Sequence, residues 1–261
     1  MNILFIGDVV ANTGCEFVRR VLPEYKKQNN IDLVIINGEN SADGNGITPF
    51  SSAHLFDSGA DVITGGNHTL RRREVHPLLD ENPCLLRPHN INCNYGSGYC
   101  LYDLGRTQVA VINLAGVIYM DEEHTSNPFL AADELIERAK SDGAKIIIVD
   151  FHAEATSEKR ALGIYLDGKA SAVIGTHTHT QTADEQILKN GTGYITDAGM
   201  TGPEDSILGV ESSIIISRLR DKNMSKFVTA NTPCFLCGVK LCIDEKSGKC
   251  TDITRVMIRK G

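Results

Sequence analysis

The sequence lacks an excess of positive charge. Its 26 Lys and Arg residues are outnumbered by 33 Asp and Glu residues, and the formal net charge at pH 7 is −7. Binding along a nucleic-acid backbone needs a basic face, so we expect no stable binding of nucleic acid. A phosphate group must therefore be held locally, by metal ions or helix N-termini inside a cleft.

The sequence also lacks a long uninterrupted apolar run. No stretch is apolar enough to span a bilayer, so no membrane partner is expected. The apolar run at residues 3–6 is too short for a secretory signal, and no basic residue precedes it. These features predict a cytoplasmic protein, in which the eight cysteines stay reduced.

Four cysteines lie in the C-terminal fifth of the chain: Cys234, Cys237, Cys242 and Cys250. They offer a single Cys-x-x-Cys pair, within a segment whose pattern is that of alternating strands. Ordinary structural thiols are the favoured interpretation, and a zinc site is the less favoured one.

The composition is that of a folded protein. Hydrophobic residues make up 41% and charged residues 23% of 261 residues, enough for one sizeable core. Because no repeat, low-complexity run or linker interrupts the chain, we expect one domain over residues 1–261.

Apolar strands and helices alternate along most of the chain. We expect buried strands at 2–7, 32–37, 61–64, 145–150 and 170–175, helices at 15–28, 48–58 and 131–141, and shorter strands at 99–104 and 108–114. This order predicts a mainly parallel sheet covered on both faces. From residue 207 onward, an alternating Ile/Val pattern predicts hairpins in a second sheet.

Polar residues follow five of the expected strands, where parallel sheets bind their ligands. They are Asp8, Glu39, Asn67, His68, His152, His177 and His179. Each alone is readily explained as a cap, a turn residue or a structural histidine. Together they favour a metal centre, because mixed carboxylate, amide and imidazole ligands suit Mn, Fe or Zn.

Two features of this set point to a pair of cations. His177 and His179 are two positions apart, and alternate residues at a strand end face the same side. The carboxylate of Glu39 has two oxygens and can bridge two cations. Two metals about 3.5–4 Å apart are the usual arrangement for displacement at phosphate esters. The residues therefore predict a phosphoesterase in which one metal activates water and both neutralise the phosphoryl oxygens.

Several motifs resemble those of a known family. They are Phe5-Ile-Gly-Asp8, Ile35-Ile-Asn-Gly-Glu39-Asn40, Gly66-Asn67-His68, Asp150-Phe-His152-Ala-Glu154-Ala-Thr-Ser-Glu158-Lys159, Gly175-Thr-His177-Thr-His179 and Thr196-Asp-Ala-Gly-Met200. On these residues the chain resembles the calcineurin-like metallophosphoesterases and, within them, the YmdB-like 2′,3′-cyclic nucleotide phosphodiesterases. The long motif from Asp150 to Lys159 is the most specific of them.

The resemblance implies an α/β fold, a four-layer α/β/β/α sandwich. It implies a hydrolase that uses two divalent or mixed-valence metal ions, iron or manganese first and zinc as an alternative, and a small phosphodiester substrate. By position, Asp8, Glu39 and His179 hold one metal, and Glu39, Asn40, Asn67, His152 and His177 surround the other. His68 is then the general acid.

Two segments depart from the family pattern. Val10–Cys15 replaces a loop that usually continues with a glycine and a Gly-Arg pair, and Thr69–Arg73 follows His68 where an aromatic residue is usual. Both departures bear on substrate preference. Arg71, Arg72 and Arg73 are favoured as a solvated face over a phosphate contact, and His54, His76, His89 and His124 follow no strand and are left out of the site.

Two other functions compete with the enzyme. A metal-binding regulatory protein with weak or vestigial phosphoesterase activity needs the same ligands but no acid, so His68 favours the enzyme. A dinucleotide-binding domain is disfavoured because the turn at Gly7 lacks the Gly-x-Gly-x-x-Gly pattern and Asp8 would repel a pyrophosphate. Whether identical chains assemble into an oligomer stays open at this point.

Overall fold

The computed structural model describes residues 1–120 and 125–259. Its strands are β1 Asn2–Ile6, β2 Asp8–Val9, β3 Leu33–Asn37, β4 Val62–Thr64, β5 Tyr99–Asp103, β6 Gln108–Ala115, β7 Ile146–His152, β8 Ala172–Thr176, β9 Gln186–Ile187, β10 Gly193–Ile195, β11 Met200–Pro203, β12 Cys234–Ile243 and β13 Cys250–Arg259. Its helices are α1 Ala11–Gln28, α2 Pro49–Asp57, α3 His76–Glu81, α4 Pro128–Ser141, α5 Thr156–Tyr165 and α6 Ser212–Asp221, with single 3-10 turns at Thr69–Arg71 and Arg73–Val75.

The strands form two sheets. The first has the order β2-β11-β12-β1-β3-β4, with β13 also paired to β12, and the second has the order β5-β6-β7-β8-β10-β9. Within them, β1, β3 and β4 run parallel, as do β6, β7 and β8. The carboxyl ends of these strands therefore lie at a common edge of each sheet.

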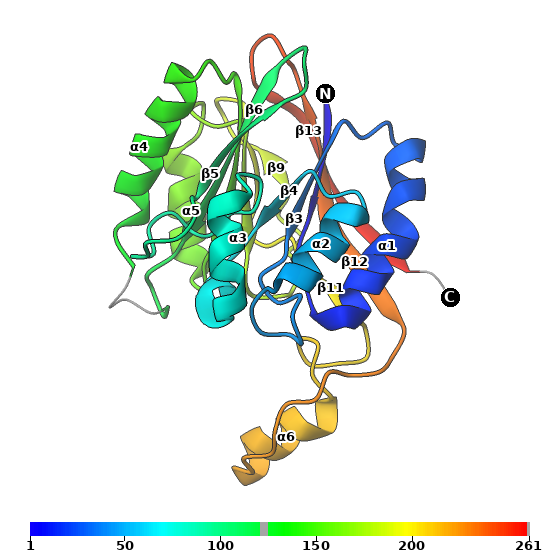
Figure 1. Ribbon diagram of the computed structural model, residues 1–261. Coiled ribbons are helices and arrows are strands. Elements are labelled where there is room, and N and C mark those ends of the chain that lie inside the picture. Colours follow the sequence, from blue (N-terminus) through cyan, green and yellow to red (C-terminus); the bar gives the residue numbers. More distant parts are fainter. Residues whose placement is uncertain (121–124, 260–261) are drawn as a thin grey trace.

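The molecule has four layers, which confirms the fold that the family resemblance implies. Phe5 and Ile35 of the first sheet share one apolar cluster with Val111 and Ile148 of the second, so the sheets pack face to face. A second cluster joins the outer face of the first sheet to α1, α2 and α3, and a third joins the outer face of the second sheet to α4 and α5. Figure 1 shows these helices on the two sides of the sheet pair. The parallel strands β1, β3, β4, β6, β7 and β8 are thus buried on both faces, which explains the continuous apolar runs.

The C-terminal hairpin joins a different sheet from the one expected. β12 and β13 form the predicted hairpin, but β12 pairs antiparallel with β1 over Cys242 to Gly238 and so belongs to the first sheet. The assignment to a second sheet was wrong, because an alternating pattern indicates a strand but does not name its partner. The first helix also begins earlier than predicted, at Ala11 instead of residue 15.

The prediction of strands from residue 207 onward is wrong for residues 212–221, which form α6. Ile215, Ile216 and Leu219 have helical spacing, and the helix ends at Lys222 in a left-handed conformation (φ 57°). None of its residues is buried, and Figure 1 shows it projecting from the end of the body toward which β1 runs. We call the segment 207–229 the arm. None of the helices in the described ranges combines the length and apolar composition that crossing a bilayer requires.

Candidate active site

The two sheets bring all the predicted site residues to one place. Asp8 begins β2, His152 is the last residue of β7, and the others lie in the loops that follow β3, β4 and β8. Residues from both sheets face each other here, which the parallel order of the strands makes possible. The contacts between them fall into two groups.

The first group surrounds the imidazole of His152. Its Nε2 atom lies 3.2 Å from Glu39 Oε1, 3.1 Å from Asn67 Oδ1 and 3.0 Å from His177 Nδ1. Glu39, His152 and His177 are also the three described residues whose ligand atoms lie within 4.8 Å of one another in metal-site geometry. Four lone-pair atoms converge, and such a set suits a cation of intermediate softness.

The second group surrounds Asp8. Its Oδ2 atom accepts a hydrogen bond from the backbone N–H of His177 (3.1 Å), and Oδ1 is buried without a hydrogen-bond partner. His179 Nε2 lies 3.7 Å from this Oδ1 atom and 3.1 Å from the amide nitrogen of Asn40. A buried carboxylate oxygen without a partner is costly unless a cation completes its coordination. Asn40 thus lies beside His179, and Glu39 stands between the two groups.

Gly66 forms the wall of the first group. A Cβ atom at this position would lie 2.2 Å from Glu39 Oε2 and 2.4 Å from His152 Nε2. Only a residue without a side chain leaves space among these ligands. The absent side chain, the partnerless oxygen of Asp8 and the donor set together fit a metal centre.

Hydrogen bonds behind His152 determine which ring nitrogen faces the site. The Thr176 hydroxyl donates to Asp150 Oδ1 (2.8 Å), so it accepts from His152 Nδ1 at 2.9 Å. Asp150 is fully buried and also accepts from Asn37 Nδ2 (2.9 Å). Nδ1 of His152 therefore keeps its proton, and Nε2 is the atom presented to the other ligands.

A second carboxylate orients His177. Glu154 Oε2 lies 3.2 Å from His177 Nε2, which leaves Nδ1 toward His152. Glu154 and Thr176 were not among the residues predicted for the site. Their closeness in sequence to predicted ligands could have identified them. Glu154 stands two positions after His152 in the most specific motif, and Thr176 directly precedes His177.

His177 and His179 converge for a reason other than strand alternation. β8 ends at Thr176, and both histidines adopt left-handed backbone conformations, with φ of 101° and 63°. The argument from alternating side chains was therefore wrong, although the two rings do lie in one site. Such conformations cost about 1–3 kcal/mol each and cluster at functional sites.

The charges of the site compensate one another. Burial lowers the pKa of His152, but the carboxylates of Glu39, Asp8 and Asp150 together outweigh burial and raise the pKa to about 9. Burial opposes ionisation of Glu39, yet His152 holds the pKa of this carboxyl below its usual range. Burial and then the charge of His152 lower the pKa of His177 to about 3. In the absence of a cation, protonated His152 provides the positive charge beside Glu39 that a bound metal would provide.

His68 lies at the rim of this site. Its backbone N–H donates to Glu39 Oε2 (3.0 Å), and its Nδ1 atom lies 3.1 Å from Asn40 Oδ1. The side chain is 24% exposed, whereas that of Glu39 is 1% exposed. Burial lowers the pKa of His68, with Glu39 opposing this effect. The ring is thus positioned to meet a bound molecule at the edge of the ligand set.

The remaining histidines and cysteines lie elsewhere. His54, His76 and His89 contact Glu16, Tyr95 and Glu134, respectively, and His124 lies outside the described residues. Cys234, Cys237 and Cys242 are spread along β12 and Cys250 is on β13. Within residues 1–120 and 125–259 these four thiols form no group with the spacing of metal ligands.

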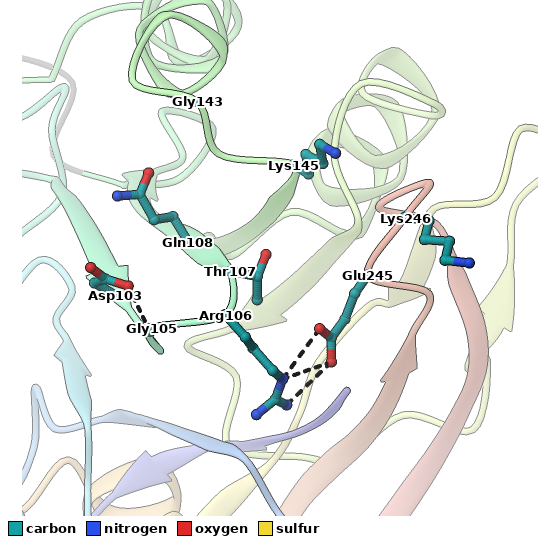
Figure 2. A pocket seen from close by; sticks show the side chains of 9 residues that line it. All are labelled: Asp103, Gly105, Arg106, Thr107, Gln108, Gly143, Lys145, Glu245 and Lys246. Atoms are coloured by element: carbon teal, nitrogen blue, oxygen red, sulfur yellow. Dashed lines mark hydrogen bonds and ion pairs between the residues drawn. The ribbon is translucent and has the colours of Figure 1, made fainter.

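A hollow of about 530 Å³ lies at the amino-terminal ends of β6 and β7, at the opposite end of these strands from His152. Figure 2 shows that the Arg106 side chain points to Glu245 across this hollow. Arg106 also pairs with Asp32 at 2.7 Å, so its charge is already neutralised. The residues that line this hollow are therefore not part of the candidate site.

Comparisons with known proteins identify the family of the chain. The family model described as YmdB-like protein matches residues 4–256. The chain is 46% identical to the 2′,3′-cyclic-nucleotide 2′-phosphodiesterase of Bacillus subtilis (strain 168), over 99% of this chain and 97% of the relative.

Two solved structures are similar over nearly their whole length. One is a hypothetical protein from Thermus thermophilus, which is 38% identical with a TM-score of 0.92 over 100% of both chains. The other is described as a novel phosphatase of Mycoplasma pneumoniae and is 31% identical with a TM-score of 0.93, over 99% of this chain and 93% of the other. The chain belongs to the YmdB-like protein family.

Proposed function

We propose that the chain is a metal-dependent phosphodiesterase that hydrolyses small phosphodiesters, with 2′,3′-cyclic nucleotides as the preferred class. The observation that carries this proposal is the convergence of lone-pair atoms around His152 and Asp8, in a chain 46% identical to the B. subtilis phosphodiesterase. A location in the cytoplasm and assembly of identical chains stay predictions, which cell fractionation and light scattering test.

The proposed cofactors are two metal ions, iron or manganese in preference to zinc. Asp8 and His179 are the proposed ligands of one, Asn67, His152 and His177 are those of the other, and Glu39 is shared. The resemblance assigns Asn40 to the second metal, but its amide lies 3.1 Å from His179 Nε2, so we propose it beside the first. When bound, two such ions supply a nucleophilic hydroxide at neutral pH and neutralise charge on the phosphoryl oxygens. This ligand set contains no sulfur, which supports the choice of metals.

The protein residues position the ligands and move a proton. Thr176 and Glu154 hold His152 and His177 in the orientations described above. We assign His68 the role of general acid, because its ring stands at the exposed rim, where an oxygen leaving the phosphorus would depart. Its proton must then reside on the ring nitrogen that faces away from Asn40.

The amide of Asn40 controls that proton. In the structure, Asn40 Nδ2 donates to Glu39 Oε1 (3.0 Å), so Oδ1 accepts from His68 Nδ1. A neutral ring then carries no proton on Nε2. Reversing the nearly isosteric amide turns Oδ1 toward His179 and Nδ2 toward His68, which moves the ring proton to Nε2. In this proposal, the rotation that would turn Asn40 Oδ1 toward His179 also places the acidic proton on Nε2 of His68.

A substrate panel tests the function. The metal-loaded protein is assayed on 2′,3′-cyclic AMP, 3′,5′-cyclic AMP, a phosphomonoester and single-stranded RNA. We expect the 2′,3′-cyclic nucleotide to have the highest kcat/KM. Faster turnover of the monoester or of RNA would refute the substrate class, and absence of hydrolysis with iron, manganese and zinc alike would refute the enzyme.

A further inference from the structure

A cleft of about 590 Å³ opens beside His68. Its lining includes Arg71 and Arg72, which follow His68 in the chain, and Leu208, Lys226 and Phe227 of the arm. Its volume lies within the range of small-molecule sites. The cleft is thus adjacent to the proposed catalytic histidine and is bounded by a segment that packs little against the body.

The cleft carries more positive charge than the scissile phosphate accounts for. Arg71, Arg72 and Lys226 line it, and Asp43 is the one carboxylate among the lining residues. The chain as a whole has a formal charge of −7, so this concentration of cations is local. A 2′,3′-cyclic phosphate has a single negative charge, and that charge belongs at the ligands around His152. The cations of the cleft therefore face a different part of the substrate.

The two arginines are held by one residue. Arg71 donates to Asn45 Oδ1 at 3.0 Å, and Arg72 Nε donates to the backbone carbonyl of Asn45 at 3.1 Å. Arg72 also lies 4.0 Å from Asp43. A guanidinium has five N–H donors, so most of them stay free for an anion. The interpretation of all three arginines as a solvated face therefore suits Arg73 better than its two neighbours.

The arm supplies an aromatic surface. The ring of Phe227 is 59% exposed, and the guanidinium of Arg218 lies over it at 4.5 Å. A cation on one face leaves the other face of the ring available for stacking. Stacking of a base on an aromatic side chain stabilises binding without selecting a particular base.

We propose that this cleft binds the 5′ side of the substrate, with a second phosphate against Arg71, Arg72 and Lys226 and a base against Phe227. The inference rests on the proposed function and names its substrate class: a nucleotide that carries a 5′-phosphoryl group in addition to the 2′,3′-cyclic phosphate. That phosphate belongs either to a mononucleotide or to the preceding residue of a short oligonucleotide.

Three matched substrates separate these sources. Adenosine 2′,3′-cyclic phosphate has no second phosphate, its 5′-phosphorylated form has one, and the dinucleotide ApA with a terminal 2′,3′-cyclic phosphate has one plus a second base. We expect kcat/KM to rise about tenfold with the 5′-phosphate, the size of one charge-assisted hydrogen bond. A further rise with the dinucleotide identifies an oligonucleotide end with its preceding base against Phe227. No further rise identifies a mononucleotide and overturns the contact of a base with Phe227.

Variants are compared through the ratio of kcat/KM with and without the 5′-phosphate, since a ratio cancels differences in folding and metal loading. Arg71→Gln and Lys226→Gln are expected to lower the ratio at least threefold. Arg73→Gln is the matched control, because Arg73 is absent from the lining of the cleft, and it should leave the ratio unchanged. Phe227→Leu should reduce the additional preference for the dinucleotide.

A binding experiment on the metal-free protein tests the cleft independently of hydrolysis. Adenosine 3′,5′-bisphosphate is expected to bind at least about fivefold more tightly than adenosine 3′-monophosphate, and Arg71→Gln should remove the difference. Equal affinities of these two probes, together with equal kcat/KM for the first two substrates, would overturn the inference and leave the proposed function intact. If no substrate is hydrolysed but the affinities differ, the proposed function fails and the phosphate site stands.

Discussion

Lys159 and Asp197 form an ion pair inside the protein, with Nζ 2.8 Å from Oδ2 and side-chain exposures of 1% and 0%. The same Oδ2 atom accepts hydrogen bonds from the backbone N–H (3.0 Å) and the hydroxyl (2.8 Å) of Thr178. Thr178 stands between His177 and His179, whose backbones are in left-handed conformations. The pair therefore holds the loop that presents two of the proposed metal ligands.

Lys159→Met should be strongly destabilising, because it leaves the carboxylate of Asp197 buried without a counter-charge. We expect a loss of about 3–5 kcal/mol in the free energy of unfolding, measured by urea denaturation. The double variant Lys159→Met/Asp197→Asn should lose less than the sum of the two single changes. Lys140→Met is the control, because Lys140 pairs with Glu137 at the surface, with exposures of 52% and 72%, and should change stability by less than about 0.5 kcal/mol.

Gly66→Ala should abolish metal binding without unfolding the chain. The added methyl group would lie 2.2 Å from Glu39 Oε2 and displace the ligands around it. Elemental analysis after reloading measures the bound metal, and circular dichroism checks the fold. Gly105→Ala adds the same methyl group at a turn where nothing lies within 4 Å and φ is 76°, so it should cost about 1–2 kcal/mol of backbone strain and retain metal. Equal metal contents of the two variants would contradict this account of the site.

Glu39→Ala should reduce the metal content more than the loss of any other single ligand. Glu39 stands between the group around His152 and the group around Asp8, so both metals lose a ligand. We expect nearly two metals per chain in the parent protein after anaerobic reloading, and mainly one in Asp8→Ala or His179→Ala. Saturation of the parent protein at one metal would exclude the two-metal centre.

The stability of the metal-free protein should depend on pH through His152. Its folded-state pKa of about 9 lies above the ordinary value of 6.5. The contribution of its proton to stability is therefore fully present below pH 6.5 and is lost as the pH rises through 9. A metal must displace that proton, so the rise in Tm on adding saturating manganese should increase over the same interval. Thermal denaturation at pH 6, 7.5 and 9 measures this, and a Tm gain that is constant with pH would argue against His152 as a ligand.

His68→Ala should retain metal and lose turnover. On a diester with a poor leaving group the expected loss is about 10²–10⁴-fold, the usual contribution of a general acid. A nitrophenyl diester needs little protonation of its leaving group and should lose much less. If the two losses are equal, or if metal is lost as well, His68 acts as a ligand instead of an acid.

Much of the fold follows from local patterns in the sequence. Buried strands appear as continuous apolar runs because each sheet is covered on both faces, and this pattern needs no knowledge of strand partners. The same local patterns failed for the arm, whose helix was predicted as strands. No residue of its helix α6 is fully buried, so the helical spacing of Ile215, Ile216 and Leu219 is short and was read as part of the Ile/Val-rich strand pattern that follows.

The sequence by itself also predicted which residues are candidate ligands, because the residue that follows a buried strand must emerge at the edge of the sheet. Only the tertiary structure decided how those residues meet. The hydrogen bond from the His177 backbone to Asp8 joins residues 169 positions apart, and Asp150 fixes the proton on His152 through Thr176. Local propensity alone disfavours the left-handed backbones of His177 and His179. They persist because contacts with residues distant in the sequence stabilise them.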